Sequence, residues 1–163
     1  MITMALGILI PSDPHVPMEA KDFHTLDDYQ QAVGGYVEAV SLGRSRHYLF
    51  INEEGKLHHP RGNRRATIYW WLELFPQRVD DEICGDAVVV GSADENGRTE
   101  DLPMSLVRLL LAASRYSVEL RLRGFGWDPE RTLFVDYFEA GRWALKTALE
   151  HPEVEEFLIS ADS

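Results

Sequence analysis

The segment from Val33 to Gly91 constrains the fold more than any other part of the chain, because glycines and other turn-forming residues divide it into short pieces. After Gly34 the residues alternate between apolar and polar, which is typical of a β-strand. A second apolar run at 47–51 is followed by Asn-Glu-Glu-Gly, and we expect this turn to close a hairpin with Gly55 at a positive φ. The segment therefore predicts short strands that reverse direction at these turns.

A short helix is expected immediately before this segment. Thr25 is suited to cap it, with Asp28 at the third helical position. Leu26, Tyr29 and Val33 recur at helical spacing and predict one buried stripe. The glycine that follows can adopt the left-handed conformation that ends many helices. Both ends of this helix are therefore marked in the sequence.

A second helix is predicted over 64–75, with Asn63 as its N-cap and Pro76 after its end. It carries an aromatic run, Tyr69, Trp70 and Trp71. The two tryptophans are about 100° apart around a helix, which is too wide for a single buried stripe. We expect the run to serve the core and packing within the chain, or else a protein–protein interface, since Trp and Tyr anchor such surfaces. A homo-oligomer is one form of that interface.

Three further strands are expected before residue 92: an apolar strand at 3–10, an edge strand near 18–23 and an interior strand at 87–90. A polar loop follows at 92–102, which is predicted to be mobile or to mark a boundary. Beyond the loop we expect a helix capped by Asp101, strands at 117–123 and 133–137, a helix at 139–150 and an edge strand at 157–160.

Together these elements predict an α+β protein with a small mixed, mainly antiparallel sheet packed by three to four helices and a C-terminal β-β-α-β extension. The predicted division is one domain at 1–100 and an acidic extension at 101–163. The extension either completes the same sheet or docks as a subdomain. A chain of 163 residues is long enough to bury a substantial core.

Charge is distributed unevenly along the chain, whose net charge is −11 at pH 7. So acidic a protein is unsuited to coat nucleic acid, because neutralising phosphates needs a basic surface. Residues 44–65 reverse the trend, with six Lys and Arg against two Glu. Arg64 and Arg65 begin a helix, where cations are unfavourable and need nearby carboxylates or an anionic ligand. Pairing with Glu38, Glu53 or Glu54 is one solution. The other is a site for a phosphate-bearing partner, formed by Lys56, Arg61, Asn63, Arg64 and Arg65.

Metal, cofactor and catalytic sites are not indicated by the residue pattern. Cys84 is the only cysteine, which excludes an internal disulfide and a cysteine-based zinc site and favours a reducing, cytoplasmic setting. The adjacent His58 and His59 are not spaced to bind one metal ion. The longest apolar runs are too short to span a membrane, and the apolar start of the chain predicts a buried strand rather than a signal peptide.

Four motifs in order carry a family resemblance: VGGYVEAVSL, FINEEGKL, NRRAT and GDAVVVG. They resemble the domain of unknown function 3846 family of actinobacteria, other Gram-positive bacteria, their plasmids and phages. The resemblance covers roughly residues 5–100 and implies a small α+β unit in a phage or mobile-element context. It implies no reaction and no functional residues. The chain departs from the family pattern in a longer segment at 70–82 and in residues 101–163.

The resemblance and the charge distribution together favour binding over catalysis. We expect a small phage or mobile-element accessory protein that binds a host protein, one form of which is mimicry of DNA by an acidic surface. The alternative is a nucleotide or nucleic-acid binding module that uses residues 44–65. A second alternative is an uncharacterised enzyme, which requires a deep pocket with converging titratable groups.

Overall fold

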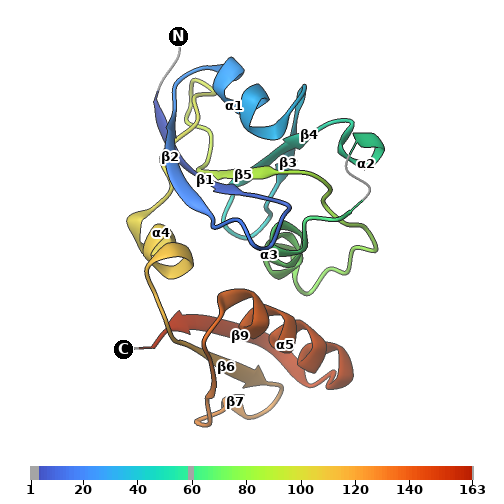
Figure 1. Cartoon of the computed structure of the whole chain (residues 1–163). Helices are drawn as coiled ribbons and strands as arrows, with labels where there is room; N and C mark the ends of the chain where they lie inside the picture. Colours follow the sequence, from blue (N-terminus) through green and yellow to red (C-terminus); the bar gives the residue numbers. More distant parts are fainter. Residues whose placement is uncertain (1–3, 59–60, 163) are drawn as a thin grey trace.

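The computed structural model describes residues 4–58 and 61–162. Within them the chain forms two antiparallel sheets with helices between and around them (Figure 1), which confirms the predicted α+β class. The first sheet has the strand order β2-β1-β5-β4-β3. Its strands are β1 (Ala5–Ile10), β2 (Glu19–Phe23), β3 (Val37–Ser41), β4 (Tyr48–Asn52) and β5 (Ala87–Val90). The two edges of this sheet are therefore β2 and β3.

Strand β5 lies at the centre of the first sheet and is buried on both faces. Its side chains alternate, so that Val88 and Val90 join one apolar cluster while Ala87 and Val89 join another. Helix α1 (Leu26–Val33) covers the first of these faces, and α3 (Arg64–Leu74) covers the second. The interior strand predicted at 87–90 is confirmed.

Helix α1 has both of its predicted ends. The Thr25 side chain accepts a hydrogen bond from the Asp28 amide, the Asp28 carboxylate accepts one from the Thr25 amide, and Gly34 closes the helix at φ 79°. Tyr29 and Val33 are buried as expected. The expectation for Leu26 is wrong, since 63% of its surface is exposed. Leu26 borders an open groove at the β3 edge instead of lying under the sheet.

The hairpin predicted at residues 52–55 is wrong. The β3–β4 hairpin closes earlier, through the loop at 42–47, and after Asn52 the chain enters the short helix α2 (Gly55–His58). Gly55 is buried and does not have a positive φ. A side chain there would collide with the carbonyl oxygen of Cys84, so glycine is needed for a close approach and not for a turn.

The C-terminal part forms its own sheet, in which β6 pairs with three other strands. Its elements are β6 (Tyr116–Leu122), β7 (Gly126–Trp127), β8 (Thr132–Phe134), α5 (Tyr137–Glu150) and β9 (Val154–Ala161). The order is thus β-β-β-α-β, with β7 unexpected. Tyr137 does not end a strand as predicted, because Asp136 caps α5 at this point.

Asp101 does not cap the preceding helix α4 (Met104–Leu111), whose N-cap is Pro103. Its carboxylate accepts a hydrogen bond from the Leu6 amide at 2.6 Å and so joins the loop at 92–102 to β1. The physical cause is that β5 pairs only with Ile8–Ile10 of β1, so the Leu6 amide competes for the same carboxylate.

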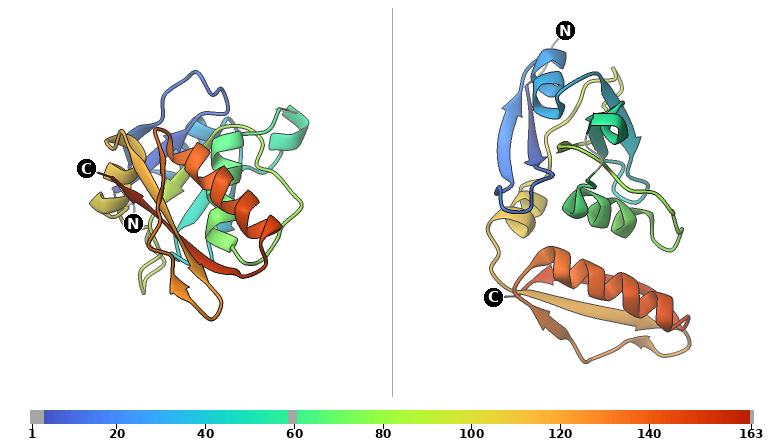
Figure 2. Two further views of the ribbon diagram at one scale, coloured as in Figure 1. Left: turned by 90° about the horizontal axis from the view of Figure 1, so that it is seen from below. Right: turned by 45° about the vertical axis from the view of Figure 1, so that its right-hand side comes forward.

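Helix α5 lies between the C-terminal sheet and α3 (Figures 1 and 2). The two sheets share no strand pairing among the described residues. One apolar cluster nevertheless runs through both parts, from Ile8 in β1 to Phe157 in β9. The division of the chain at residue 100 stays a prediction.

Candidate functional site

The five residues predicted to bind an anion do not converge on one point. Asn63 and Arg65 are directed at backbone carbonyls, and Lys56 is paired with Asp81. Arg61 and Arg64 are exposed, and neither forms an ion pair with another residue that the structure describes. The predicted pairing of Arg64 and Arg65 with Glu38, Glu53 or Glu54 is likewise not seen among the described residues.

Asn63 is fully buried and joins β1, the segment before β5 and α3. Its Oδ1 accepts from the Ala66 amide at 3.1 Å, which makes it the predicted N-cap of α3. Its Nδ2 donates to the carbonyl oxygens of Ile10 and Gly85 at 2.8 and 3.0 Å. All three hydrogen bonds serve the fold, so the side chain has no donor left for a ligand.

Arg65 fastens the loop between β1 and β2. Its Nη2 donates to the carbonyl oxygens of Pro11, Asp13 and Val16 at 2.8, 3.1 and 2.8 Å. Partial burial lowers the pKa of this guanidinium from its ordinary value. The side chain stays charged, because the pKa of arginine lies far above neutral.

Replacing Arg65 by methionine is expected to loosen this loop and to lower the free energy of unfolding by about 1–2 kcal/mol, since hydrogen bonds from a charged group are lost at a partly exposed site. Methionine keeps most of the apolar stem. Hydrogen exchange should rise at residues 12–17 and stay unchanged in β6–β9. The same substitution at the exposed Arg64 is the matched control and should leave both measurements near those of the parent protein.

The predicted aromatic interface is divided among three environments. Tyr69 is buried in the core, where desolvation raises the pKa of its hydroxyl well above the ordinary value. Trp71 is partly buried, and its indole Nε1 donates to the carbonyl oxygen of Asp81 at 3.0 Å. Trp70 is also partly buried and lines a groove. Only this last residue is placed to meet a ligand.

The groove beside Trp70 has a volume of about 540 Å³ and lies between β3, α2 and the segment before β5. Apolar side chains of Val40, Ile51, Trp70 and Ile83 line it. Five carboxylates also line it, those of Glu38, Glu53, Glu54, Asp81 and Glu82, and all five residues are exposed. We call this site the acidic groove.

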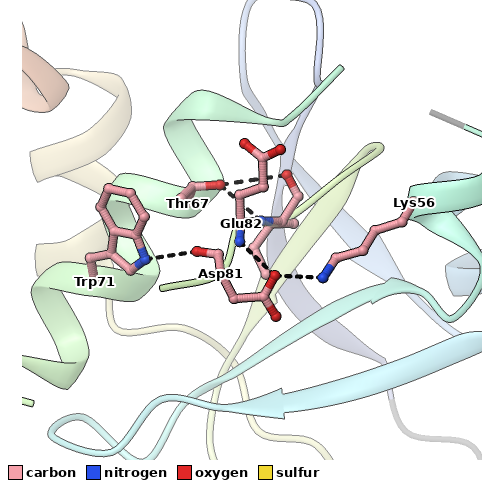
Figure 3. Close-up of polar contacts among 6 residues, drawn as sticks. Lys56, Thr67, Trp71, Asp81 and Glu82 are labelled. Atoms are coloured by element: carbon pink, nitrogen blue, oxygen red, sulfur yellow. Dashed lines mark hydrogen bonds and ion pairs between the residues drawn. The ribbon is translucent and has the colours of Figure 1, made fainter. Parts of the chain in front are cut away.

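One wall of the acidic groove is fastened to both neighbouring helices (Figure 3). The Thr67 hydroxyl donates to the Asn63 carbonyl and accepts from the Ile83 amide at 2.9 Å, which holds the wall against α3. Lys56 Nζ donates to Asp81 Oδ1 at 2.5 Å, which holds it against α2. A wall held at these points is formed before any ligand arrives, and such preorganisation lowers the cost of binding.

The acidic groove is negatively charged at neutral pH. The hydrogen bond from Lys56 lowers the pKa of Asp81, and the same bond raises the pKa of Lys56, so both groups stay ionised. Lys56 is the one cation lining the groove among the described residues, against five carboxylates. The charge at this place is therefore opposite to that of the anion site predicted around Lys56.

A second groove, of about 590 Å³, lies on the opposite face of the sheet at the same edge. Its floor is apolar and includes Leu26, Tyr29 and Phe50, with the Tyr29 ring edge-on to Phe50 at 4.8 Å between centroids. His24 and Arg98 stand among its polar lining residues. We call this site the aromatic groove.

The sequence carries no local signal for either groove. Glu38 and Asp81 are 43 positions apart in the chain (81 − 38), and the acidic pairs near position 81 have the composition of ordinary solvated loops. The structure brings these residues together through the pairing of β3 with β4 and the hydrogen bonds of the wall.

The described residues contain no group of three or more His, Cys, Asp or Glu arranged to hold a metal ion. Nor do they include a helix long and apolar enough to cross a membrane.

Comparison with known proteins assigns the chain to a family. No curated protein and no solved structure matches it. The model of the family described as Domain of unknown function (DUF3846) matches residues 7–114, which is more than half of the chain. The match agrees with the resemblance seen in the sequence motifs and extends past residue 100 through α4. The chain belongs to the DUF3846 family.

Proposed function

We propose that this protein is a binding module and that its acidic groove holds a positively charged segment of a partner protein. The observation that carries the proposal is the convergence of five carboxylates around an apolar floor and one indole. In the phage or mobile-element context that the resemblance implies, the partner is a host protein.

A lysine or arginine side chain matches both parts of the acidic groove. Its methylene stem can pack on Val40 and Ile51, while its charged end reaches the carboxylates at the rim. The Trp70 indole adds an attraction for a cation over its ring face, on the order of 0.5–1 kcal/mol at a partly exposed site. Phosphate groups are repelled by the same carboxylates, which counts against a nucleotide ligand at this place.

A direct test compares two short labelled peptides by fluorescence anisotropy, one alternating lysine with valine and one alternating glutamate with valine. The lysine peptide should bind and the glutamate peptide should not. Binding should weaken as salt is added, because exposed ion pairs are screened. Equal binding of the two peptides, or binding of neither, contradicts the proposal.

The acidic groove is then tested by the triple change Glu38→Gln, Glu53→Gln and Glu82→Gln. None of the three is ion-paired with another described residue, so the fold should be retained. Three exposed ion pairs contribute together on the order of 1–2 kcal/mol, so affinity for the lysine peptide should fall about tenfold. The matched control changes Glu119, Glu130 and Glu139 to Gln in the C-terminal part. It alters the net charge equally and also breaks no ion pair among the described residues. A similar loss in the control would mean that overall charge, and not the groove, attracts the peptide.

A further inference from the structure

Strand β3 is an open edge that lies between the two grooves. It pairs with β4 on one side, and no described strand pairs with its other side. Glu38 and Val40 line the acidic groove, Val37 lines the aromatic groove, and Ala39 lines both. The opposite edge, β2, is protected by the exposed charged side chains of a Glu-Ala-Lys-Asp run, a common defence against added strands.

The backbone of β3 has unpaired groups on its outer side. The Glu53 amide donates to the Tyr36 carbonyl, and the Leu42 amide donates to the His47 carbonyl. Antiparallel pairing alternates along a strand, so residues 36, 38, 40 and 42 are directed toward β4. The N–H and C=O groups of Val37, Ala39 and Ser41 are therefore directed outward, away from the sheet.

We propose that the partner segment binds as a sixth strand of the first sheet, hydrogen-bonded to the outer backbone groups of β3. This inference rests on the proposed function and specifies the geometry of binding. Side chains of an added strand alternate between the two faces of the sheet. One set enters the acidic groove and the other set enters the aromatic groove.

The two grooves differ in chemistry, and this difference defines the partner sequence. The acidic groove accepts lysine or arginine. The aromatic groove has an apolar floor in which Tyr29 meets Phe50 edge-on. Behind the floor, Tyr29 stacks on the buried Phe23 at 4.7 Å between centroids. Arg98 at this second groove disfavours another cation. The matching segment is therefore extended, with basic and apolar residues at alternate positions.

A second copy of this chain does not fit the same edge. Pairing of β3 with β3 of another copy would bring two sets of groove carboxylates close together. Like charges across paired strands are destabilising. The occupant is a basic segment of a different protein.

The test of strand addition uses Ala39→Pro, with Ala39→Ser as its matched control. Proline removes an outward N–H, which β4 does not use, and proline is tolerated on an edge strand in such a position. The proline variant should keep its circular dichroism spectrum and lose at least about tenfold in affinity for the alternating lysine–valine peptide, which corresponds to the loss of a main-chain hydrogen bond at the interface. The serine variant changes the same side chain but keeps the outward N–H, so it should lose much less affinity than the proline variant.

Two further measurements test strand addition on the parent protein, without any substitution. A peptide of the same composition with its lysines and valines in separate blocks should bind more weakly than the alternating peptide. In the parent protein, the alternating peptide should also slow hydrogen exchange of the Val37, Ala39 and Ser41 amides. If both peptides bind equally and Ala39→Pro has no effect while the triple glutamine change still weakens binding, strand addition is wrong and the proposed function survives. If the triple change has no effect either, the proposed function fails as well.

Discussion

Replacing Asn63 by alanine is expected to lower the free energy of unfolding by about 3–5 kcal/mol. The side chain is fully buried and makes three hydrogen bonds. Its removal leaves the carbonyls of Ile10 and Gly85 and the amide of Ala66 without partners, and each buried unpaired group costs about 1–3 kcal/mol. Because small domains have about 5–15 kcal/mol of stability in total, most of the margin is lost.

The variant Asn63→Asp separates the contribution of the helix cap from that of the two hydrogen bonds that Asn63 donates. The introduced carboxylate can still accept from the Ala66 amide, but it cannot donate to Ile10 or Gly85 and brings a charge against two carbonyls. Burial among acceptors raises the folded-state pKa of such a carboxyl above its unfolded value. A raised pKa means that the folded state holds the proton more tightly, so the stability lost at neutral pH should be partly recovered as the pH falls.

Urea denaturation of both Asn63 variants between pH 5 and pH 8 measures these effects. The exposed Asn96→Ala is the matched control and should change stability by less than about 0.5 kcal/mol. A loss below about 1 kcal/mol in Asn63→Ala would contradict the buried network. If the free energy of unfolding depends on pH in the same way in Asn63→Asp and in the parent, the assignment of Asn63 Nδ2 as the donor to Ile10 and Gly85 would be wrong.

Both ends of α1 and the start of α3 were predictable because their signals are local. Thr25 and Asp28 need only each other and the turn between them to form the capping box, and Gly34 needs only its own φ. Asn63 was predicted as a cap for the same reason. Its two donors were not, because Ile10 and Gly85 come from distant strands and loops.

Gly55 shows why the turn after β4 was predicted incorrectly. A glycine after Asn-Glu-Glu has the composition of a hairpin turn, but the need for glycine comes from the backbone of Cys84, which is distant in sequence. Asn52 does form a local turn, since its Oδ1 accepts from the Glu54 amide two residues on. Its buried Nδ2 also donates to the Val33 carbonyl at the end of α1. This second contact depends on the packing of α1 against β4, which periodicity does not describe.

The candidate site was unpredictable for a related reason. Counting charges along 44–65 indicated a basic segment, yet Arg65 is directed at backbone carbonyls and Lys56 at Asp81. The carboxylates that surround Lys56 come from β3, the β4–α2 turn and the segment before β5. Charge in space is set by the strand order of the sheet, and that order cannot be derived from local composition.

Replacing Gly141 by leucine should separate α5 from α3 and lower the free energy of unfolding by about 2–3 kcal/mol. A Cβ at this position would lie 2.8 Å from Leu72 Cδ1 and 3.1 Å from Ile68 Cγ2, both on α3. Alanine is the graded control. Its small clash is with flexible side-chain ends, and it gains about 1 kcal/mol of helix propensity, so Gly141→Ala should stay near the parent or slightly above it.

The same variant tests the predicted division of the chain at residue 100. Residues 116–161 alone would make a very small domain, and such domains bury too little surface to be more than marginally stable. The apolar cluster of this part also continues through α3 into the first sheet. The parent should therefore unfold in one urea transition, and Gly141→Leu should shift that transition and raise hydrogen exchange more in β6–β9 than in β1–β5. Two transitions in the parent would mean that the parts fold separately. An unchanged midpoint in Gly141→Leu would mean that the α3–α5 contact does not couple them.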